Sequence, residues 1–288
     1  MANNRGSSTV GYSAGRHRSG KSIVQKILLY LILILVAVLC AGPFLWMLST
    51  SFKGNENIYE MSLFPRHPTF ANYVGVVQFL DLPIYIWNTF VMTALGILLD
   101  VVLASLCAYP LAKFDFYGKK VITGALLATQ ILPAAAGLIV NYITVGSLGL
   151  MGSYWAVILP GSVAVFSIIL FRQAYFSVST EVMEASRIDG ASEFKIWYKI
   201  MAPQILPAIS TVIIFDFINK WNNFLWPIIV LNPDKYPIAA ALNYLGGTFN
   251  FQFGYIAAAT IISIVPIIIV FVFFQKNYIN SVAGAVKG

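Results

Sequence analysis

Three charged side chains lie within long apolar stretches of this sequence: Asp100, Asp216 and Lys220. A charge at the centre of a bilayer costs about 2.5 to 3.5 kcal/mol on insertion scales, so such residues pair with one another or relay ions and protons. Asp216 and Lys220 are four residues apart, so on one helix they share a face and form a pair. We expect Asp100 to face the interior of the subunit or a partner. The alternative is an ion-coupled carrier in which both carboxylates relay protons.

The sequence predicts no catalytic, cofactor or metal site. His17 and His67 are far apart and form neither a metal site nor an acid–base pair. Residues 15–22 match the phosphate-loop pattern G-x-x-x-x-G-K-[ST], but no apolar strand precedes them to deliver the loop to a helix N-terminus. The basic residues are spread over separate short loops, which disfavours nucleic acid binding. We therefore expect a chain that is not an enzyme.

The composition indicates that most of the chain is surrounded by a bilayer. Of 288 residues, 59% are hydrophobic and 10% are charged, whereas a soluble domain carries about 25% charged residues. The mean hydropathy is +0.79. Since a membrane-spanning helix needs about 20 mainly apolar residues, the sequence predicts an all-α membrane protein with six transmembrane helices, approximately Val24–Ser49, Ile84–Ala112, Val121–Thr144, Tyr154–Phe171, Ile205–Val230 and Tyr255–Phe274. Cys40 and Cys107 fall at opposite depths of these spans, so we expect two small buried thiols.

The distribution of lysine and arginine predicts the orientation, because basic loops stay in the cytoplasm. With six spans, most basic residues fall on the side of the two chain ends, and the opposite side holds Lys53, Arg66 and Lys235. Both termini are therefore expected in the cytoplasm. Residues 1–23 are expected to be a flexible basic tail that lies against anionic lipid, and residues 24–288 to be the transmembrane domain.

The clearest local signals lie in residues 179–203, in the longest loop on the cytoplasmic side. Ser179 precedes acidic residues that suit the first turn of a helix, Gly190 ends that helix, and Ser192 begins another. We therefore predict two short helices that meet at a glycine elbow. A pair of helices lying on lipid headgroups would explain the same pattern.

The same segment resembles the EAA loop of permeases from binding-protein-dependent ABC importers, whose pattern is E-A-A-x3-G-x9-I-x-L-P. The matching residues, at the matching spacing, are Glu184, Ala185, Ser186, Gly190, Ile200, Ala202 and Pro203. Ser186 stands where the pattern has its second alanine, and Ala202 where it has leucine. Both replacements are small residues and leave the elbow intact.

Further stretches are similar to the sugar permeases of this family, and the resemblance covers about residues 25–288. They are Asn88–Phe90, Ala108–Phe114, Leu148–Leu150, Tyr154–Ala156, Ile188–Ala191 and Trp221–Pro227. The end of the chain, Ala283–Gly288, resembles that of the six-span member of the maltose-type permease pair. The chain is therefore identified as a member of the carbohydrate importer permeases.

The resemblance implies a permease subunit in the bacterial cytoplasmic (inner) membrane that forms half of a sugar pathway. The partners it implies are a second, different permease subunit, two cytoplasmic ATPases, an extracytoplasmic solute-binding protein, the sugar and membrane lipid. The EAA loop would fit a cleft on one ATPase, with Glu184 and Arg187 as docking contacts. The ATPase-coupling residues implied are Glu184, Ala185, Ser186, Arg187, Asp189, Gly190 and Ala191.

The fifth span is the expected place of a sugar path, because Asn219, Trp221 and Asn222 lie close together there. Sugars bind by stacking on aromatic rings and by hydrogen bonds from amides. Aromatic residues near a span end also form interfacial belts, so that interpretation stays open. The first external loop, residues 50–83, is expected to meet the binding protein or to cover the span ends. A permease of the same family for another solute class is the alternative function.

Overall fold

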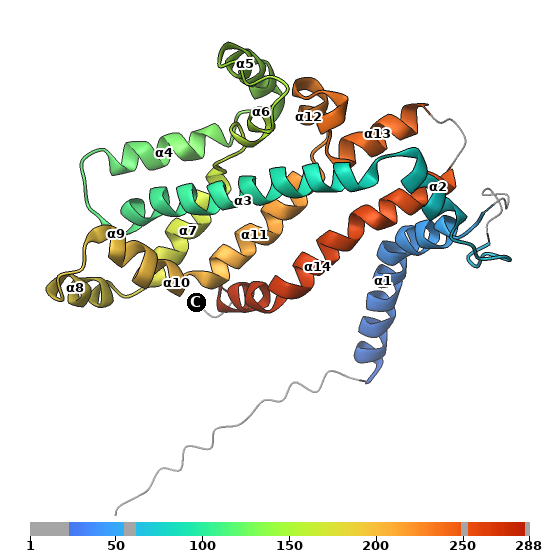
Figure 1. The fold of residues 1–288 in the computed structure, drawn as a ribbon. Coiled ribbons are helices and arrows are strands. Elements are labelled where there is room, and N and C mark those ends of the chain that lie inside the picture. Colours follow the sequence, from blue (N-terminus) through green and yellow to red (C-terminus); the bar gives the residue numbers. More distant parts are fainter. Residues whose placement is uncertain (1–22, 55–61, 249–252, 286–288) are drawn as a thin grey trace, which may run out of the picture. The chain divides into compact units, whose positions relative to one another are not determined.

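The computed structural model describes residues 23–54, 62–248 and 253–285, and these residues form helices joined by short loops (Figure 1). Within these ranges, β pairing is limited to an isolated bridge between Lys53 and Pro68. The expectation of an all-α protein is confirmed.

The basic tail expected at residues 1–23 lies outside the described residues except for Ile23, and so does the phosphate-loop match at residues 15–22. The chain divides into two units, Met1–Trp46 and Met47–Gly288. The first unit holds the start of helix α1, and every other described helix lies in the second.

Among the residues that the structure describes, three helices are long and apolar enough to cross a bilayer: α1 over Ile23–Ser51, α3 over Leu82–Lys113, and the Phe253–Lys276 part of α14, which runs over Phe253–Ala285. At 1.5 Å per residue, even the 24 residues in α14 extend about 36 Å, beyond a hydrocarbon core of roughly 30 Å. These helices coincide with three of the six predicted stretches.

The other three predicted stretches are interrupted, which differs from the expectation of continuous helices. The pieces are α4 (Lys119–Thr129) and α5 (Ala134–Ser147), α6 (Tyr154–Ile158) and α7 (Val165–Ser177), and α11 (Leu206–Trp221) and α12 (Leu225–Val230). Pro133 and Pro160 lie in the first two breaks, where a residue without an N–H cannot continue the helix ladder. The third break follows Trp221, at Asn222, Asn223 and Phe224. Hydropathy registers apolar length and does not register such breaks.

Helix α3 is the centre of the second unit. It packs against α7 and α11, α11 packs against α14, and α14 packs against α2 (Ala71–Phe79) (Figure 1). Buried apolar side chains form three clusters along α3: one near its Lys113 end, one near its Leu82 end, and one around Met92. The remaining elements at the Leu82 end are a short 3-10 turn, Pro233–Lys235, and α13 (Ile238–Thr248).

The segment before α3 is held by hydrogen bonds from buried polar side chains. Asn72 donates through Nδ2 to the carbonyl oxygens of Ser51 and Lys53, at 3.1 and 2.9 Å. The buried Lys53 donates to the carbonyl of Ser62 at 2.7 Å. Gly254, at the start of α14, lets Asn72 approach closely, because a Cβ there would come within 2.6 Å of the Asn72 amide. This loop is therefore an ordered part of the fold in its described residues.

Both cysteines are free and exposed, Cys40 on α1 and Cys107 on α3, so the expectation of buried thiols was wrong. A thiol behaves as a small hydrophobic group. It can therefore lie on a helix surface that faces hydrocarbon without the cost that a charged side chain would carry.

Candidate functional site

Two short helices meet at a glycine within residues 179–203, as the sequence predicted. Helix α8 spans Thr180–Ile188, and the Ser179 hydroxyl accepts a hydrogen bond from the Glu181 amide at 3.2 Å. Gly190 then adopts φ +78°, a left-handed conformation that glycine reaches without strain. Ser192 caps α9 (Glu193–Ile196) by accepting from the Lys195 amide at 3.4 Å. We call α8 and α9 the coupling helix pair.

The chain leaves the coupling helix pair through an irregular stretch that the sequence did not predict. Helix α9 runs into a π-helical turn, Trp197–Met201, and then into α10 (Ala202–Gln204). A bend of 79° separates this stretch from α11. Pro203 and Pro207 lie on either side of the bend, each in the first turn of its helix, α10 and α11, where a residue without an N–H is tolerated.

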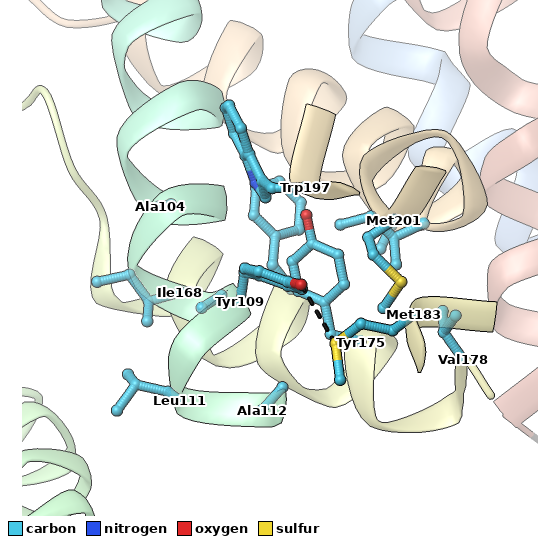
Figure 2. Close-up of a cluster of buried hydrophobic side chains, with 14 of the residues drawn as sticks. Ala104, Tyr109, Leu111, Ala112, Ile168, Tyr175, Val178, Met183, Trp197 and Met201 are labelled. Carbon is cyan, nitrogen blue, oxygen red and sulfur yellow. Dashed lines mark hydrogen bonds between the residues drawn. The ribbon is translucent and has the colours of Figure 1, made fainter. Parts of the chain in front are cut away.

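The underside of the coupling helix pair is buried against α3 and α7. Met183 of α8, Ile196 of α9 and Trp197 are 9% exposed or less. They belong to one apolar cluster with residues of α3 and α7: Ala104, Ala108, Tyr109, Ala112, Phe171 and Tyr175. Figure 2 shows Met183 and Trp197 beside Tyr109 and Tyr175. The three alanines are four residues apart on one face of α3, which leaves room for the larger side chains of its neighbours. The coupling helix pair is therefore packed onto the bundle.

Polar contacts run through this apolar cluster. The Tyr109 hydroxyl lies 3.2 Å from Met183 Sδ, the contact drawn in Figure 2, and 3.3 Å from Glu193 Oε2. Trp197 donates through Nε1 to Ser105 Oγ at 3.0 Å, and Ser105 Oγ lies 2.7 Å from the Tyr175 hydroxyl. Because hydrogen bonds are directional whereas apolar packing is not, these contacts fix the register of the helices.

Arg187 and Glu193, on either side of Gly190, form a hydrogen-bonded ion pair across the elbow. Arg187 donates through Nε to Glu193 Oε1 at 2.5 Å, and its guanidinium lies 5.7 Å from the ring centroid of Phe114. The hydrogen bond to Glu193 raises the pKa of Arg187 above its ordinary value. Both side chains are partly exposed, 39% and 48%, so solvent screening leaves the pair at most about 1 kcal/mol of stability. Its geometric effect is to join α8 to α9.

The structure divides the predicted coupling residues between two faces. Glu184, Ala185, Arg187, Asp189 and Gly190 are exposed and Ala191 is half-buried, whereas Ser186 is buried and donates to the Val182 carbonyl at 2.7 Å. Sequence reasoning missed two features. Ile188 is 87% exposed beside the elbow, and Glu193 is the partner of Arg187. The signal for that pair was opposite charge on either side of a helix-ending glycine.

The three predicted path residues do not share one surface. Asn219 and Asn222 are exposed, and Asn222 donates through Nδ2 to the Ile218 carbonyl at the end of α11. Trp221 is 2% exposed, stacks on Phe217 and donates through Nε1 to the Ser263 carbonyl at 3.0 Å. The placement of Trp221 on a path surface is therefore corrected, because its large apolar ring is more stable inside the core.

The three charged residues of the apolar stretches lie between α3, α7 and α11. Lys220 Nζ is 2.8 Å from Asp216 Oδ2. Asp100 is fully buried and accepts hydrogen bonds from the Ala164 amide at 2.6 Å and from the Ser167 hydroxyl at 2.5 Å. These donors lie at the start of α7, where the partial positive charge of a helix N-terminus favours a carboxylate. Among residues 23–54, 62–248 and 253–285, acidic, histidine and cysteine side chains form no cluster that could hold a metal ion.

Comparison with known proteins identifies relatives over nearly the whole chain. It is 31% identical over 277 residues to the arabinooligosaccharides transport system permease protein AraQ of Bacillus subtilis, covering 92% of this chain and 97% of AraQ. It is 28% identical over 265 residues to the lactose transport system permease protein LacG of Rhizobium radiobacter, covering 92% and 97%. Its fold is similar to a chain in the crystal structure of a bacterial ABC transporter involved in the import of the acidic polysaccharide alginate, with a TM-score of 0.79 and 24% identity, covering 94% of this chain and 100% of that chain.

A family model described as the binding-protein-dependent transport system inner membrane component matches residues 100–283. The match runs from the second half of α3 through the coupling helix pair and α11 to the end of α14. It therefore includes both the elbow at Gly190 and the buried charges. On this match and on the relatives above, the chain belongs to the family of inner membrane components of binding-protein-dependent transport systems.

Proposed function

We propose that this chain is a permease subunit of an ATP-driven importer of sugars or oligosaccharides and forms half of the translocation path. The observation that carries the proposal is the coupling helix pair, which has the residues of an EAA loop and is packed rigidly on α3. The relatives named for arabinooligosaccharides and lactose support a carbohydrate as the solute. Family membership favours this function over an ion-coupled carrier.

The subunit crosses the bacterial inner membrane six times, with both termini in the cytoplasm. Helices α1, α3 and α14 are three of the crossings, and the three interrupted stretches supply the others. The distribution of lysine and arginine supports this orientation. It places the coupling helix pair in the cytoplasm and the segment around α2 on the outer side, where its ordered backbone offers a surface to a binding protein.

The complete importer contains a second, different permease subunit, two cytoplasmic ATPases and an extracytoplasmic binding protein. ATP is hydrolysed on the ATPase subunits, and this chain is not an enzyme. The exposed side of the coupling helix pair docks in a cleft of one ATPase, with Glu184 at its charged part and the exposed Ile188 and Phe194 at its apolar part. Closure of the ATPases then displaces the coupling helix pair and with it the helices on which it is packed.

The sugar passes the end of α11. Asn219 and Asn222 are exposed there and offer neutral hydrogen-bonding groups, which suit an uncharged solute. Trp221 holds this end of α11 in place, since its ring is buried and its Nε1 donates to the Ser263 carbonyl of α14.

The test is to purify the importer from its native membrane through an affinity tag on this chain and to reconstitute it in liposomes. We expect the second permease and the ATPases to copurify. We also expect uptake from a panel of labelled di- and oligosaccharides that requires ATP and the binding protein of the system. Uptake by this chain alone, driven by a proton or sodium gradient, would overturn the proposal. Uptake of an amino acid or a metal but of no sugar would retain the importer and reject the substrate class.

A further inference from the structure

We propose that Glu193 is a positioning residue of the importer: its carboxylate joins Arg187 of α8 to Tyr109 of α3, so that a displacement of the coupling helix pair reaches α3 without loss. The inference rests on the proposed function, because it concerns how the coupling helix pair transmits movement. Glu193 touches neither solute nor nucleotide in this proposal.

A displacement of α8 could first be lost at the elbow, Gly190, before it reaches α9. Gly190 has the widest backbone freedom of any residue type, and it separates α8 from α9. A push on α8 alone could therefore change the angle between the helices rather than move both of them. The hydrogen bond from Arg187 Nε to Glu193 Oε1 spans this elbow from one helix to the other. The coupling helix pair then moves as one body.

The displacement could also be lost at the contact between the coupling helix pair and helix α3. The other carboxylate oxygen, Glu193 Oε2, accepts a hydrogen bond from the Tyr109 hydroxyl at 3.3 Å. Tyr109 is 4% exposed, and its ring packs edge-on against Phe114 and Tyr175 at 5.3 and 5.6 Å between centroids. One carboxylate thus holds α8 through one oxygen and α3 through the other.

Helix α3 carries the displacement into the membrane. It is continuous over its 32 residues, and Tyr109 and Asp100 are nine positions apart on it, about 14 Å at 1.5 Å per residue. Asp100 binds the start of α7 through the Ala164 amide and the Ser167 hydroxyl. A shift of Tyr109 therefore moves α3 and α7 together at the depth of the buried charges.

The pair of Arg187 and Glu193 is partly exposed, so its loss should leave the subunit folded. The experiment uses the intact importer in liposomes and measures sugar transported per ATP hydrolysed. For Glu193→Ala and for Tyr109→Phe we expect this ratio to fall about fivefold, the factor that corresponds to about 1 kcal/mol of lost hydrogen bonding. Glu193→Gln keeps one acceptor oxygen and replaces the other by an NH2 donor, so its ratio should fall less than that of Glu193→Ala.

Exchanging the charges of Arg187 and Glu193 distinguishes loss of this pair from a general loss of structure. Arg187→Glu alone places two carboxylates together and should uncouple strongly, whereas Arg187→Glu with Glu193→Arg restores an opposite pair across the elbow and should recover part of the ratio, because arginine at position 193 cannot accept from the Tyr109 hydroxyl. Asp115→Ala is the matched control, because Asp115 is an exposed carboxylate that also forms an ion pair, with Lys119 at 3.3 Å, and it lies outside the coupling helix pair. It should keep the ratio of the unmodified importer.

The outcomes separate this inference from the proposed function. If the unmodified importer moves no sugar, the proposed function fails. If it moves sugar and both Glu193→Ala and Tyr109→Phe keep its ratio, the bridge has no positioning effect and the inference fails. Should Glu193→Ala not assemble with the ATPase, Tyr109→Phe decides, since it removes one hydroxyl from an otherwise unchanged ring.

Discussion

Lys220 and Asp216 form an ion pair inside the second unit, with 2.8 Å between Lys220 Nζ and Asp216 Oδ2. Both lie on one face of α11, four residues apart, and their side chains are 19% and 10% exposed. The pair neutralises two charges that would each be costly to leave alone at this depth. It also sets a requirement on the neighbouring helix, because α3 must leave room for the long lysine side chain.

Removing one partner of this pair should destabilise the subunit. Lys220→Met leaves the Asp216 carboxylate without its cation, and breaking a buried pair costs about 3 kcal/mol or more. We expect a lower melting temperature for the purified importer in detergent. The double variant Lys220→Met with Asp216→Asn removes both charges and should recover much of the loss. A double variant no more stable than Lys220→Met would show that the two side chains do not interact in the membrane.

A side chain at Gly96 of α3 should disturb the ion pair. A Cβ at this position would come within 2.8 Å of Lys220 Cε, so in Gly96→Ala the lysine side chain must shift, which weakens its contact with Asp216. We expect a loss of about 1 to 2 kcal/mol in unfolding free energy, the usual range for overpacking. Gly124→Ala on α4 is the control, because a Cβ there meets no atom within 4 Å and alanine favours the helix. Equal thermal stability of the two variants would contradict the close approach of Lys220.

Sugar uptake by variants of Gly190 should depend on how well the new residue tolerates a positive φ. Its φ is +78° and a Cβ would meet no atom within 4 Å, so strain is backbone strain alone. Asparagine adopts this conformation more readily than alanine, and valine least. We expect sugar uptake to fall in the order Gly190→Asn, Gly190→Ala, Gly190→Val, and Gly190→Pro, whose ring requires φ near −65°, to abolish it. Membrane insertion should stay normal throughout, measured by the amount of chain in the membrane fraction. Full uptake by Gly190→Pro would refute the coupling assignment.

Substitution of Trp221 should lower the stability of the subunit, whereas substitution of Asn219 or Asn222 should change the KM for uptake. Trp221→Ala empties a core position and should cost about 3 to 5 kcal/mol of stability. Asn219→Ala and Asn222→Ala change exposed side chains and should leave the melting temperature within about 1 °C, a shift that corresponds to about 0.5 kcal/mol. We expect these two variants to raise the KM for uptake instead. Unchanged KM in both would remove the end of α11 from the proposed path.

The coupling helix pair was readable from sequence because its signals are local. Ser179 and Ser192 cap helices through atoms within three residues, and Gly190 is needed for its own φ. The pairing of Asp216 with Lys220 follows equally from a spacing of four on one helix. In each case the deciding interactions lie within one or two helical turns, so the order of residues suffices to predict them.

Two other features were not predictable from local signals. Apolar length predicted continuous spans where α4 and α5, or α11 and α12, are separate helices, because the mean hydropathy of a stretch does not show where its helix breaks. Trp221 lies in the core rather than on a path because α14 offers the Ser263 carbonyl and an apolar surface.

The bridge from Arg187 through Glu193 to Tyr109 joins residues up to 84 positions apart in sequence. By itself, the sequence determined the family, the helical class and the local geometry of the elbow. Which face of each helix is buried, and which polar groups meet across helices, depends on contacts distant in sequence. Those contacts exist only once α3, α7 and α11 have packed together.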